Sequence, residues 1–449
     1  MTKDLTVGKP FSVLWRFCLP LFLSVIFQQL YNIADSFVAG RFISSAALAA
    51  VGNSYEITMI FIAISTGINI GCSVIVSLLF GSKEYSRLRT AIYTTFISSL
   101  FICAVLMALG LIFTHPLLDM INTPSTIFDD SKTYLDIYIW GLPFMIIYNI
   151  ASGVFAALGD SKTTFWFLAI SSTANIFVDI LFVVKLNMGV GGVAWATFIC
   201  QGVSAILSLL FVIAKLKSLP YEEGEKTKLF SFQILLQVSS IAIPSILQQS
   251  FVSIGNIVVQ SAINVFGTAV IAGYSGAVKL CNVVTSAFIT LSNGVSNYTA
   301  QNYGAGNYKR IKEGYKAGLF ITLGIGIPIT ILFVILGRNM LMLFLNKNAF
   351  DAINVGVWFI RIVAPFFPVV AVKIISDAVL RGTQRMKRFM ATTFADLLLR
   401  VGLTLILSKT PLMEKGIWLS WPIGWIIGTL LSVVFIYQVM KELNQTKKS

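Results

Sequence analysis

The sequence predicts an all-α polytopic membrane protein with twelve transmembrane helices, arranged as two six-helix lobes related by a pseudo-two-fold axis along the membrane normal. Three observations predict this fold: an apolar composition, a series of long apolar runs, and an internal repeat. The chain of 449 residues is 56% hydrophobic and 12% charged, whereas soluble globular domains are about a quarter charged. Each apolar run can cross about 30 Å of hydrocarbon, and its length favours a helix over a strand of a closed barrel.

The apolar runs define the helices in order, with ends uncertain by a few residues because several runs contain proline or glycine. We expect helices near residues 14–38, 54–80, 90–114, 133–157, 163–184, 191–214, 235–262, 268–302, 315–336, 350–380, 389–408 and 416–440.

The internal repeat pairs residues that lie about 223 positions apart. Pro20 matches Pro244, and Gly81 matches Gly304. Such residues fix backbone shape more than they fill space, so the two halves share their bends. The longest polar interruption falls between the halves, which predicts an amino-terminal lobe over 1–214, a cytoplasmic linker over 215–234 and a carboxy-terminal lobe over 235–449. An even number of helices per half makes both halves enter the membrane in the same direction, a common plan of secondary transporters.

The net charge of +14 follows the membrane topology. Lysine and arginine concentrate in alternate polar segments, among them Lys83–Arg89 and Lys309–Lys316. This positive-inside bias places both termini in the cytoplasm and the chain in the cell's inner (plasma) membrane. It also accounts for the charge without a nucleic-acid partner. We expect a monomer in contact with membrane lipid.

Ionisable residues inside the predicted spans are the strongest functional signal. At the bilayer centre each would cost roughly 2.5–3.5 kcal/mol on insertion scales, so these side chains must face a watery cavity or pair with one another. They are Asp35, Asp179, Lys279, Arg361, Lys373, Asp377, Asp396 and Arg400.

The acids of the first half have no basic residue four positions away. Asn175 and Asp179 are four residues apart and therefore share one helical face. Asp35 follows Tyr31 and Asn32, which we expect in a substrate cleft, and Thr197 lies just inside the sixth span. Oxygen ligands of this kind suit a hard cation such as Na⁺. Desolvated carboxylates that lie close together would instead carry a proton.

The second half places opposite charges four residues apart in two helices. Lys373 and Asp377 share one helical face, and Asp396 and Arg400 share another. Each pair can be a structural ion pair, and Lys373–Asp377 can equally line a cavity.

Several motifs resemble the multidrug and toxic compound extrusion (MATE) family over essentially the whole chain. They are FCLPLFLSVIFQQLYNIADSFVAG, GCSVIVSLLFGSKEYSRLR, YLDIYIWGLPF, NIFVDILF and GGVAWATF in the first half, and SNYTAQNYGAGNYKRIK and AVLRGTQRMK in the second.

The resemblance implies efflux of drug-like small molecules, driven by inward Na⁺ or H⁺ and without another cofactor. It implies that Asp35, Asn175, Asp179 and Thr197 form the cation-coupling cluster of the amino lobe. Asp377 matches an acidic position that some members use. Some branches also carry a carboxylate in the seventh span, where this chain has Gln248 and Gln249, so a second coupling or substrate site beside Lys373 and Asp377 stays open.

Two other functions compete with this interpretation. A flippase for a lipid-linked saccharide should line its cleft with several arginines or lysines, and the first half has none inside its spans away from their ends. An enzyme is disfavoured because the single histidine, His115, is expected in an outer loop without a metal partner at useful spacing.

Overall fold

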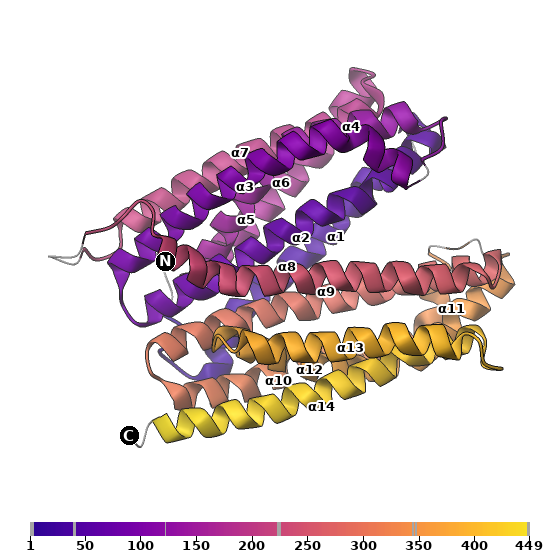
Figure 1. Ribbon diagram of the computed structural model, residues 1–449. Helices are drawn as coiled ribbons and strands as arrows, with labels where there is room; N and C mark the ends of the chain where they lie inside the picture. The colour runs from indigo at the N-terminus through magenta and orange to yellow at the C-terminus, as the bar shows by residue number, and fades with distance from the viewer. Residues whose placement is uncertain are drawn as a thin grey trace. The chain divides into compact units, whose positions relative to one another are not determined.

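A computed structural model describes residues 4–38, 42–121, 123–221, 226–343, 345 and 348–446, and within them leaves out the side chains of residues 30–38, 45, 48, 55, 56 and 446. The described residues are almost entirely helical (Figure 1). Eleven helices are long and apolar enough to span a membrane, and a bent helix pair supplies the twelfth span. The all-α polytopic fold class predicted from the sequence is therefore confirmed.

The helices of the first half follow one another with short connections. They are α1 (Pro10–Val38), α2 (Ser45–Gly81), α3 (Tyr85–Met120), α4 (Phe128–Trp140), α5 (Leu142–Ala157), α6 (Ser161–Ile180), the π-helical turn η2 (Leu181–Lys185) and α7 (Gly189–Lys217). His115 was predicted in a loop, and this is wrong: it lies inside α3, exposed, with Nδ1 2.9 Å from Asp119 Oδ2.

The second half repeats this order. Its helices are α8 (Phe232–Asn264), α9 (Thr268–Gly304), α10 (Tyr308–Leu341), α11 (Phe350–Val363), the 3₁₀ turn η3 (Ala364–Phe366), α12 (Phe367–Gly382), α13 (Met386–Leu407) and α14 (Glu414–Thr446).

Proline breaks one span in each half at the equivalent place. The predicted helix 133–157 is the bent pair α4 and α5, whose axes meet at 50° around Gly141, two residues before Pro143. The predicted helix 350–380 is interrupted by η3, which contains Pro365. Proline has no N–H to donate and its ring displaces the preceding turn, so neither helix continues unbroken.

The chain forms two compact units, and their limits fall inside helices. Unit 1 comprises Met1–Asp4 and Leu19–Ile246, and unit 2 comprises Leu5–Cys18 and Leu247–Ser449. The first helix of each half therefore belongs partly to each unit. The division falls within two residues of the internal proline, which is Pro20 in α1 and Pro244 in α8.

Small residues allow the helices of unit 2 to pack closely. A Cβ added to Gly273 of α9 would lie 2.3 Å from the carbonyl oxygen of Ala352 in α11. A Cβ added to Gly356 would lie 2.9 Å from the carbonyl oxygen of Gly273. The two backbones approach as in small-xxx-small pairs of membrane helices, where van der Waals packing replaces the hydrophobic drive for association.

We predict that Gly273→Ala destabilises the protein by about 1–3 kcal/mol, because the new methyl group meets backbone that cannot move aside. Thermal unfolding of the detergent-purified protein measures this. Gly324→Ala in α10 is the matched control, since a Cβ there meets nothing within 4 Å. Equal unfolding temperatures for the two variants would contradict the close packing of α9 on α11.

A salt bridge joins the start of α6 to the end of α7. The Asp160 carboxylate caps α6 by accepting the Thr163 N–H at 3.3 Å, and it pairs with Lys215 Nζ at 2.6 Å. Burial acts to raise the pKa of Asp160, but Lys215 and the Thr163 N–H outweigh it and hold this pKa below its ordinary value. Asp160 therefore stabilises the fold at pH values above the pKa that it has in the unfolded chain.

We predict that Asp160→Asn, which keeps a capping side chain, lowers the unfolding temperature at pH 7 through loss of the Lys215 pair. The difference should shrink as the pH falls below about 4, because the carboxylate of the unfolded chain then takes up a proton, and it should vanish at the lower pH at which the native carboxylate is protonated too. In a Lys215→Met background Asp160→Asn should have little further effect. A difference that is independent of pH would show that the charge of Asp160 is not what stabilises the native protein.

Candidate functional site

A polar cavity of about 290 Å³ lies within unit 1. Side chains from α2, α4, α5, α6 and α7 line it, together with Gln28 of α1. Three tyrosines (Tyr134, Tyr138, Tyr148), several amides and several hydroxyls face the space. Of the described residues that line it, none is charged. The cavity can therefore accept a polar or aromatic molecule by hydrogen bonding and ring stacking.

The predicted residues of α6 and α7 come together at this cavity. Asn175 Nδ2 donates to Thr197 Oγ1 at 3.5 Å, and both residues line the cavity. Asp179 lies one helical turn further along α6 and is fully buried, at 0% exposure. The structure thus brings Asn175 and Thr197 together, and it buries Asp179 one turn after Asn175 on the same helix. The side chains of Tyr31, Asn32 and Asp35 lie outside the described residues, although α1 itself extends to Val38.

The hydrogen-bonding pattern of the helix changes directly after Asp179. The α-helical hydrogen bonding of α6 ends at Ile180, and the next five residues form the π-helical turn η2. Such wider turns within helices are often found at functional sites. Asp179 therefore stands at a local irregularity that its sequence does not signal.

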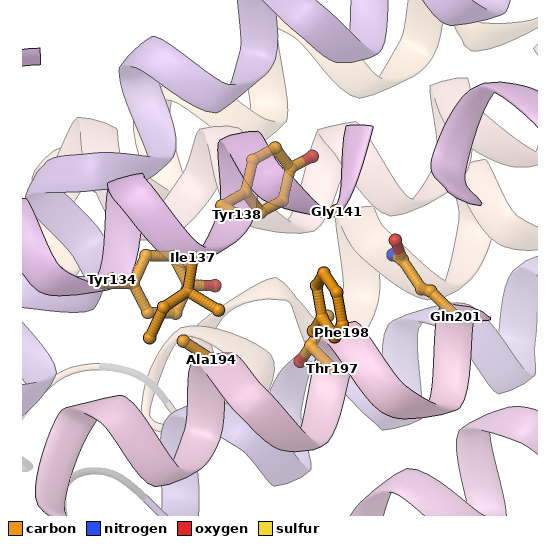
Figure 2. Close-up of a pocket in the computed structure, with 8 residues that line it drawn as sticks. All are labelled: Tyr134, Ile137, Tyr138, Gly141, Ala194, Thr197, Phe198 and Gln201. Carbon is orange, nitrogen blue, oxygen red and sulfur yellow. The ribbon is translucent and has the colours of Figure 1, made fainter. Parts of the chain in front are cut away.

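The bend between α4 and α5 shapes the wall opposite α7. Figure 2 shows Tyr134, Ile137 and Tyr138 of α4 across from side chains of α7, with Gly141 at the break between the helices. Rings from both sides meet here, since Phe144 of α5 and Phe198 of α7 lie 5.2 Å apart in a T-shaped contact. A Cβ on Gly141 would lie 3.5 Å from the Phe198 ring, so a larger side chain at the break would crowd this wall.

Sequence reasoning missed most of the cavity wall. Tyr134 and Tyr138, one turn apart on α4, stack with ring centroids 6.5 Å apart. Asn149 and Gln201 also line the space. The four-residue spacing of the tyrosines was the available signal, but a pair of this kind also occurs on ordinary packing faces.

Unit 2 buries a second polar group around Asp377. Lys373 Nζ pairs with Asp377 Oδ2 at 2.8 Å. The other carboxylate oxygen accepts hydrogen bonds from Thr392 Oγ1 at 3.0 Å and Ser432 Oγ at 2.8 Å. The predicted ion pair between Lys373 and Asp377 is therefore confirmed as a contact, and both carboxylate oxygens of Asp377 have protein partners.

The second predicted ion pair is wrong. Asp396 and Arg400 do not pair with each other among the described side chains. Asp396 Oδ2 instead lies 3.8 Å from Lys373 Nζ, and the Arg400 guanidinium stacks over the ring of Trp421 at 4.8 Å. Asp396 and Arg400 share one helical face, as their spacing predicts, but each contacts a residue of a neighbouring helix instead of the other.

Glycines of α14 make room for these charged side chains. A Cβ on Gly424 would lie 2.8 Å from Asp396 Oδ1, and a Cβ on Gly428 would lie 2.8 Å from Lys373 Cε. Gln248 and Gln249 are half-buried on α8, and neither is hydrogen-bonded to Lys373 or Asp377 within the described ranges.

Two helical units with broken spans and buried polar groups are typical of polytopic membrane transporters. The MatE family model matches residues 20–181 and matches again over 244–406. The chain therefore belongs to the MatE family of transporters, and the two matches agree with the internal repeat.

Known relatives extend over nearly the whole chain. The probable multidrug resistance protein YpnP of Bacillus subtilis (strain 168) is 25% identical over 418 residues, which cover 93% of this chain and 92% of the relative. YoeA of the same organism, also a probable multidrug resistance protein, is 25% identical over 448 residues, with 96% of each chain covered. The structure of an outward-facing multidrug resistance MATE family transporter matches with a TM-score of 0.92 and 20% identity over 98% of both chains. This last likeness is one of fold.

We predict that Lys373→Met destabilises the protein by about 3–5 kcal/mol, because it leaves buried carboxylates without their cation. Adding Asp377→Asn should recover part of this loss, since asparagine removes the charge and can still accept hydrogen bonds from Thr392 and Ser432. Thermal unfolding in detergent measures both variants, with Lys279→Met on the exposed side of α9 as control. A Lys373→Met protein as stable as the wild type would contradict the role of this ion pair.

Proposed function

We propose that this chain is a secondary active multidrug efflux antiporter, which exports lipophilic and often cationic compounds in exchange for inward Na⁺ or H⁺. The observation that carries the proposal is the hydrogen-bonded pair Asn175 and Thr197 in the wall of the 290 Å³ cavity, with the fully buried acid Asp179 one turn after Asn175 on α6. An acid buried in a membrane helix is costly and marks ion pathways by default. The names of the Bacillus subtilis relatives support the multidrug part of the proposal.

The coupling site consists of Asp179, Asn175 and Thr197, completed by Asp35 of α1. Carboxylate, amide and hydroxyl oxygens are the ligands that a hard cation prefers, so the set fits Na⁺. The same group fits a proton, because burial disfavours a charged carboxylate. Both ions act here as transported cargo rather than as a resident cofactor.

Substrate binds in the cavity that aromatic and amide side chains line. Tyr31 and Asn32 of α1 also take part in binding it. Tyrosine faces attract organic cations, with about 0.5–2 kcal/mol for each well-placed ring. The amides and hydroxyls hydrogen-bond polar groups without fixing one shape, which suits a broad range of compounds. The transporter alternates between conformations open to one side of the membrane or to the other. A cation bound at Asp35 and Asp179 shifts this equilibrium only if it binds one conformation more tightly than the other.

We assign coupling to unit 1 rather than unit 2. Both oxygens of Asp377 already have partners from three helices, so a cation there would first have to displace Lys373. Lys373, Asp377, Gln248 and Gln249 remain a secondary candidate for coupling or substrate contact.

The charge distribution supports a location in the cell's inner membrane with both termini in the cytoplasm. We expect the chain to act as a monomer. A flippase for a lipid-linked saccharide is the competing function. Its anionic phosphates would call for basic residues, and no arginine or lysine is among the described residues of the cavity wall. We therefore favour the antiporter.

We predict that Asp179→Asn, and likewise Asp35→Asn, lowers coupled efflux roughly tenfold or more while membrane expression stays intact. The measurement is substrate-induced pH change and radiolabelled Na⁺ flux in proteoliposomes of purified protein, which also identifies the ion. Asp119→Asn, at an exposed acid of α3, is the control and should transport normally. Undiminished extrusion by Asp179→Asn, or lipid-linked saccharide movement without ion flux, would overturn the proposal.

A further inference from the structure

The amino-terminal part of the chain packs on unit 2 as an arm. This arm, Leu5–Cys18, comprises a short non-helical segment and the start of α1, and α1 then continues into unit 1 at Leu19. At the end of the arm, Cys18 Sγ lies 4.0 Å from the carbonyl oxygen of Leu291 in α9. The arm therefore belongs to one unit, although the helix that it begins belongs mostly to the other.

A corner between α9 and α10 holds the non-helical segment of the arm. The corner consists of Tyr298, Gln301 and Asn302 at the end of α9 and Arg310 in the first turn of α10. The three residues of α9 are fully buried. Arg310 Nε donates to Asn302 Oδ1 at 3.0 Å, and the Tyr298 hydroxyl donates to the Arg310 carbonyl at 3.3 Å. The corner is thus held in shape by contacts of its own.

The corner binds the backbone of the arm at three groups. The Leu5 N–H donates to Gln301 Oε1 at 3.0 Å. The Leu5 carbonyl accepts from Asn302 Nδ2 at 3.4 Å and from Arg310 Nη2 at 3.2 Å. The Gly8 carbonyl accepts from Arg310 Nη1 at 2.6 Å. One guanidinium therefore joins two carbonyls of the arm, and charged donors form the stronger hydrogen bonds.

The sequence of the arm fits this corner at two positions. The Leu5 side chain is buried, at 1% exposure, whereas Val7 is 66% exposed. Gly8 has a φ of +91°, a conformation that residues with a Cβ rarely adopt. The corner therefore suits a segment with an apolar residue at one position and a glycine three positions later.

The start of α8 is held on unit 1 in a similar manner. This helix belongs to unit 1 up to Ile246. Just before it, the backbone N–H groups of Lys228 and Ser231 donate to the hydroxyls of Thr90 and Thr94 in α3, at 3.0 Å each. Each half thus begins its first helix on the unit that contains most of the other half. Unit 1 uses neutral hydroxyls for this contact, and unit 2 uses a charged guanidinium.

We infer that the α9–α10 corner is a binding site for the segment Leu5–Gly8, and that the arm docks there reversibly. The bond from Arg310 to Gly8 lies at the surface, where water competes for both groups. Because α1 enters unit 1 at Leu19, docking decides whether the start of α1 moves with unit 2 or with unit 1. A docked arm stiffens the link between the units, and a released arm loosens it.

The test is thiol labelling of the full-length, detergent-purified protein, in a background in which the five native cysteines are alanine. Leu5→Cys places a thiol where the side chain is buried, and Val7→Cys places one where it is exposed. We expect N-ethylmaleimide to modify the Leu5→Cys protein at least about tenfold more slowly than the Val7→Cys protein. The slower reaction should still reach completion in the folded protein, because each release of the arm exposes the thiol.

Two changes on opposite sides of the contact should release the arm. Arg310→Met removes both guanidinium bonds to the arm, and Gly8→Ala disfavours the docked backbone without altering unit 2. Each should speed labelling of the Leu5→Cys protein about tenfold, as expected for loss of a hydrogen bond to a charged group or for a Cβ at positive φ. Labelling of the Val7→Cys protein should not change. Lys309→Met is the matched control, since Lys309 is exposed beside Arg310 and donates to no carbonyl of the arm among the described residues.

Three results would overturn the inference. Equal labelling rates at positions 5 and 7 would show that the arm is not docked. Protection of the Leu5→Cys protein until it is denatured would show a permanent anchor instead of a reversible site. Unchanged labelling of the Leu5→Cys protein by both Arg310→Met and Gly8→Ala would show that the corner does not hold the arm. These rates are measured without ions or drugs being transported, so they stand apart from the efflux assay.

Discussion

The cost of an unpaired charge in hydrocarbon is the constraint on which the rest of this structure depends. A charged side chain at the centre of a helix costs about 2.5–3.5 kcal/mol on insertion scales, and the two units meet that cost differently. Unit 2 surrounds Asp377 with Lys373, Thr392 and Ser432. Unit 1 buries Asp179 on α6, one turn after Asn175, which lines a cavity. The Asp377 group is tied to three helices by hydrogen bonds and an ion pair, which favours a fixed structure.

The same constraint applies to the backbone where helices break. Pro368 has no N–H, so the carbonyl of Ala364, four residues earlier, lacks its α-helical donor and accepts the Phe367 N–H instead. Thr330 of α10 supplies a hydroxyl to that carbonyl at 3.3 Å. A neighbouring helix thereby completes the hydrogen bonding that the proline removed, as membrane proteins require. Broken spans are tolerated here because side chains from adjacent helices donate hydrogen bonds to the carbonyls at the breaks.

The sequence predicted the helices well and the side-chain partners less well. Apolar length is a local property, so the spans followed from the length of the apolar runs. The breaks at Gly141 and Ala364–Phe366 and the π-helical turn η2 were missed. Partners are set by packing between helices. The spacing of Asp396 and Arg400 would allow an ion pair on one helical face. Asp396 instead lies near Lys373, and Arg400 stacks on Trp421, both from other helices. Asn175 and Thr197 were predicted together only through family resemblance, because no periodicity relates two different helices.

The two units use arginine for the same structural task at the start of their third helix. In unit 2, Arg310 donates to the carbonyls of Leu5 at 3.2 Å and Gly8 at 2.6 Å. In unit 1, Arg89 donates to the carbonyls of Leu216, Leu219 and Pro220. The repeat aligns Arg310 with Arg87 rather than Arg89, so the task is shared although the position is not. Arg310 also donates Nε to Asn302 at 3.0 Å, whereas Arg89 keeps Nη1 without a described partner.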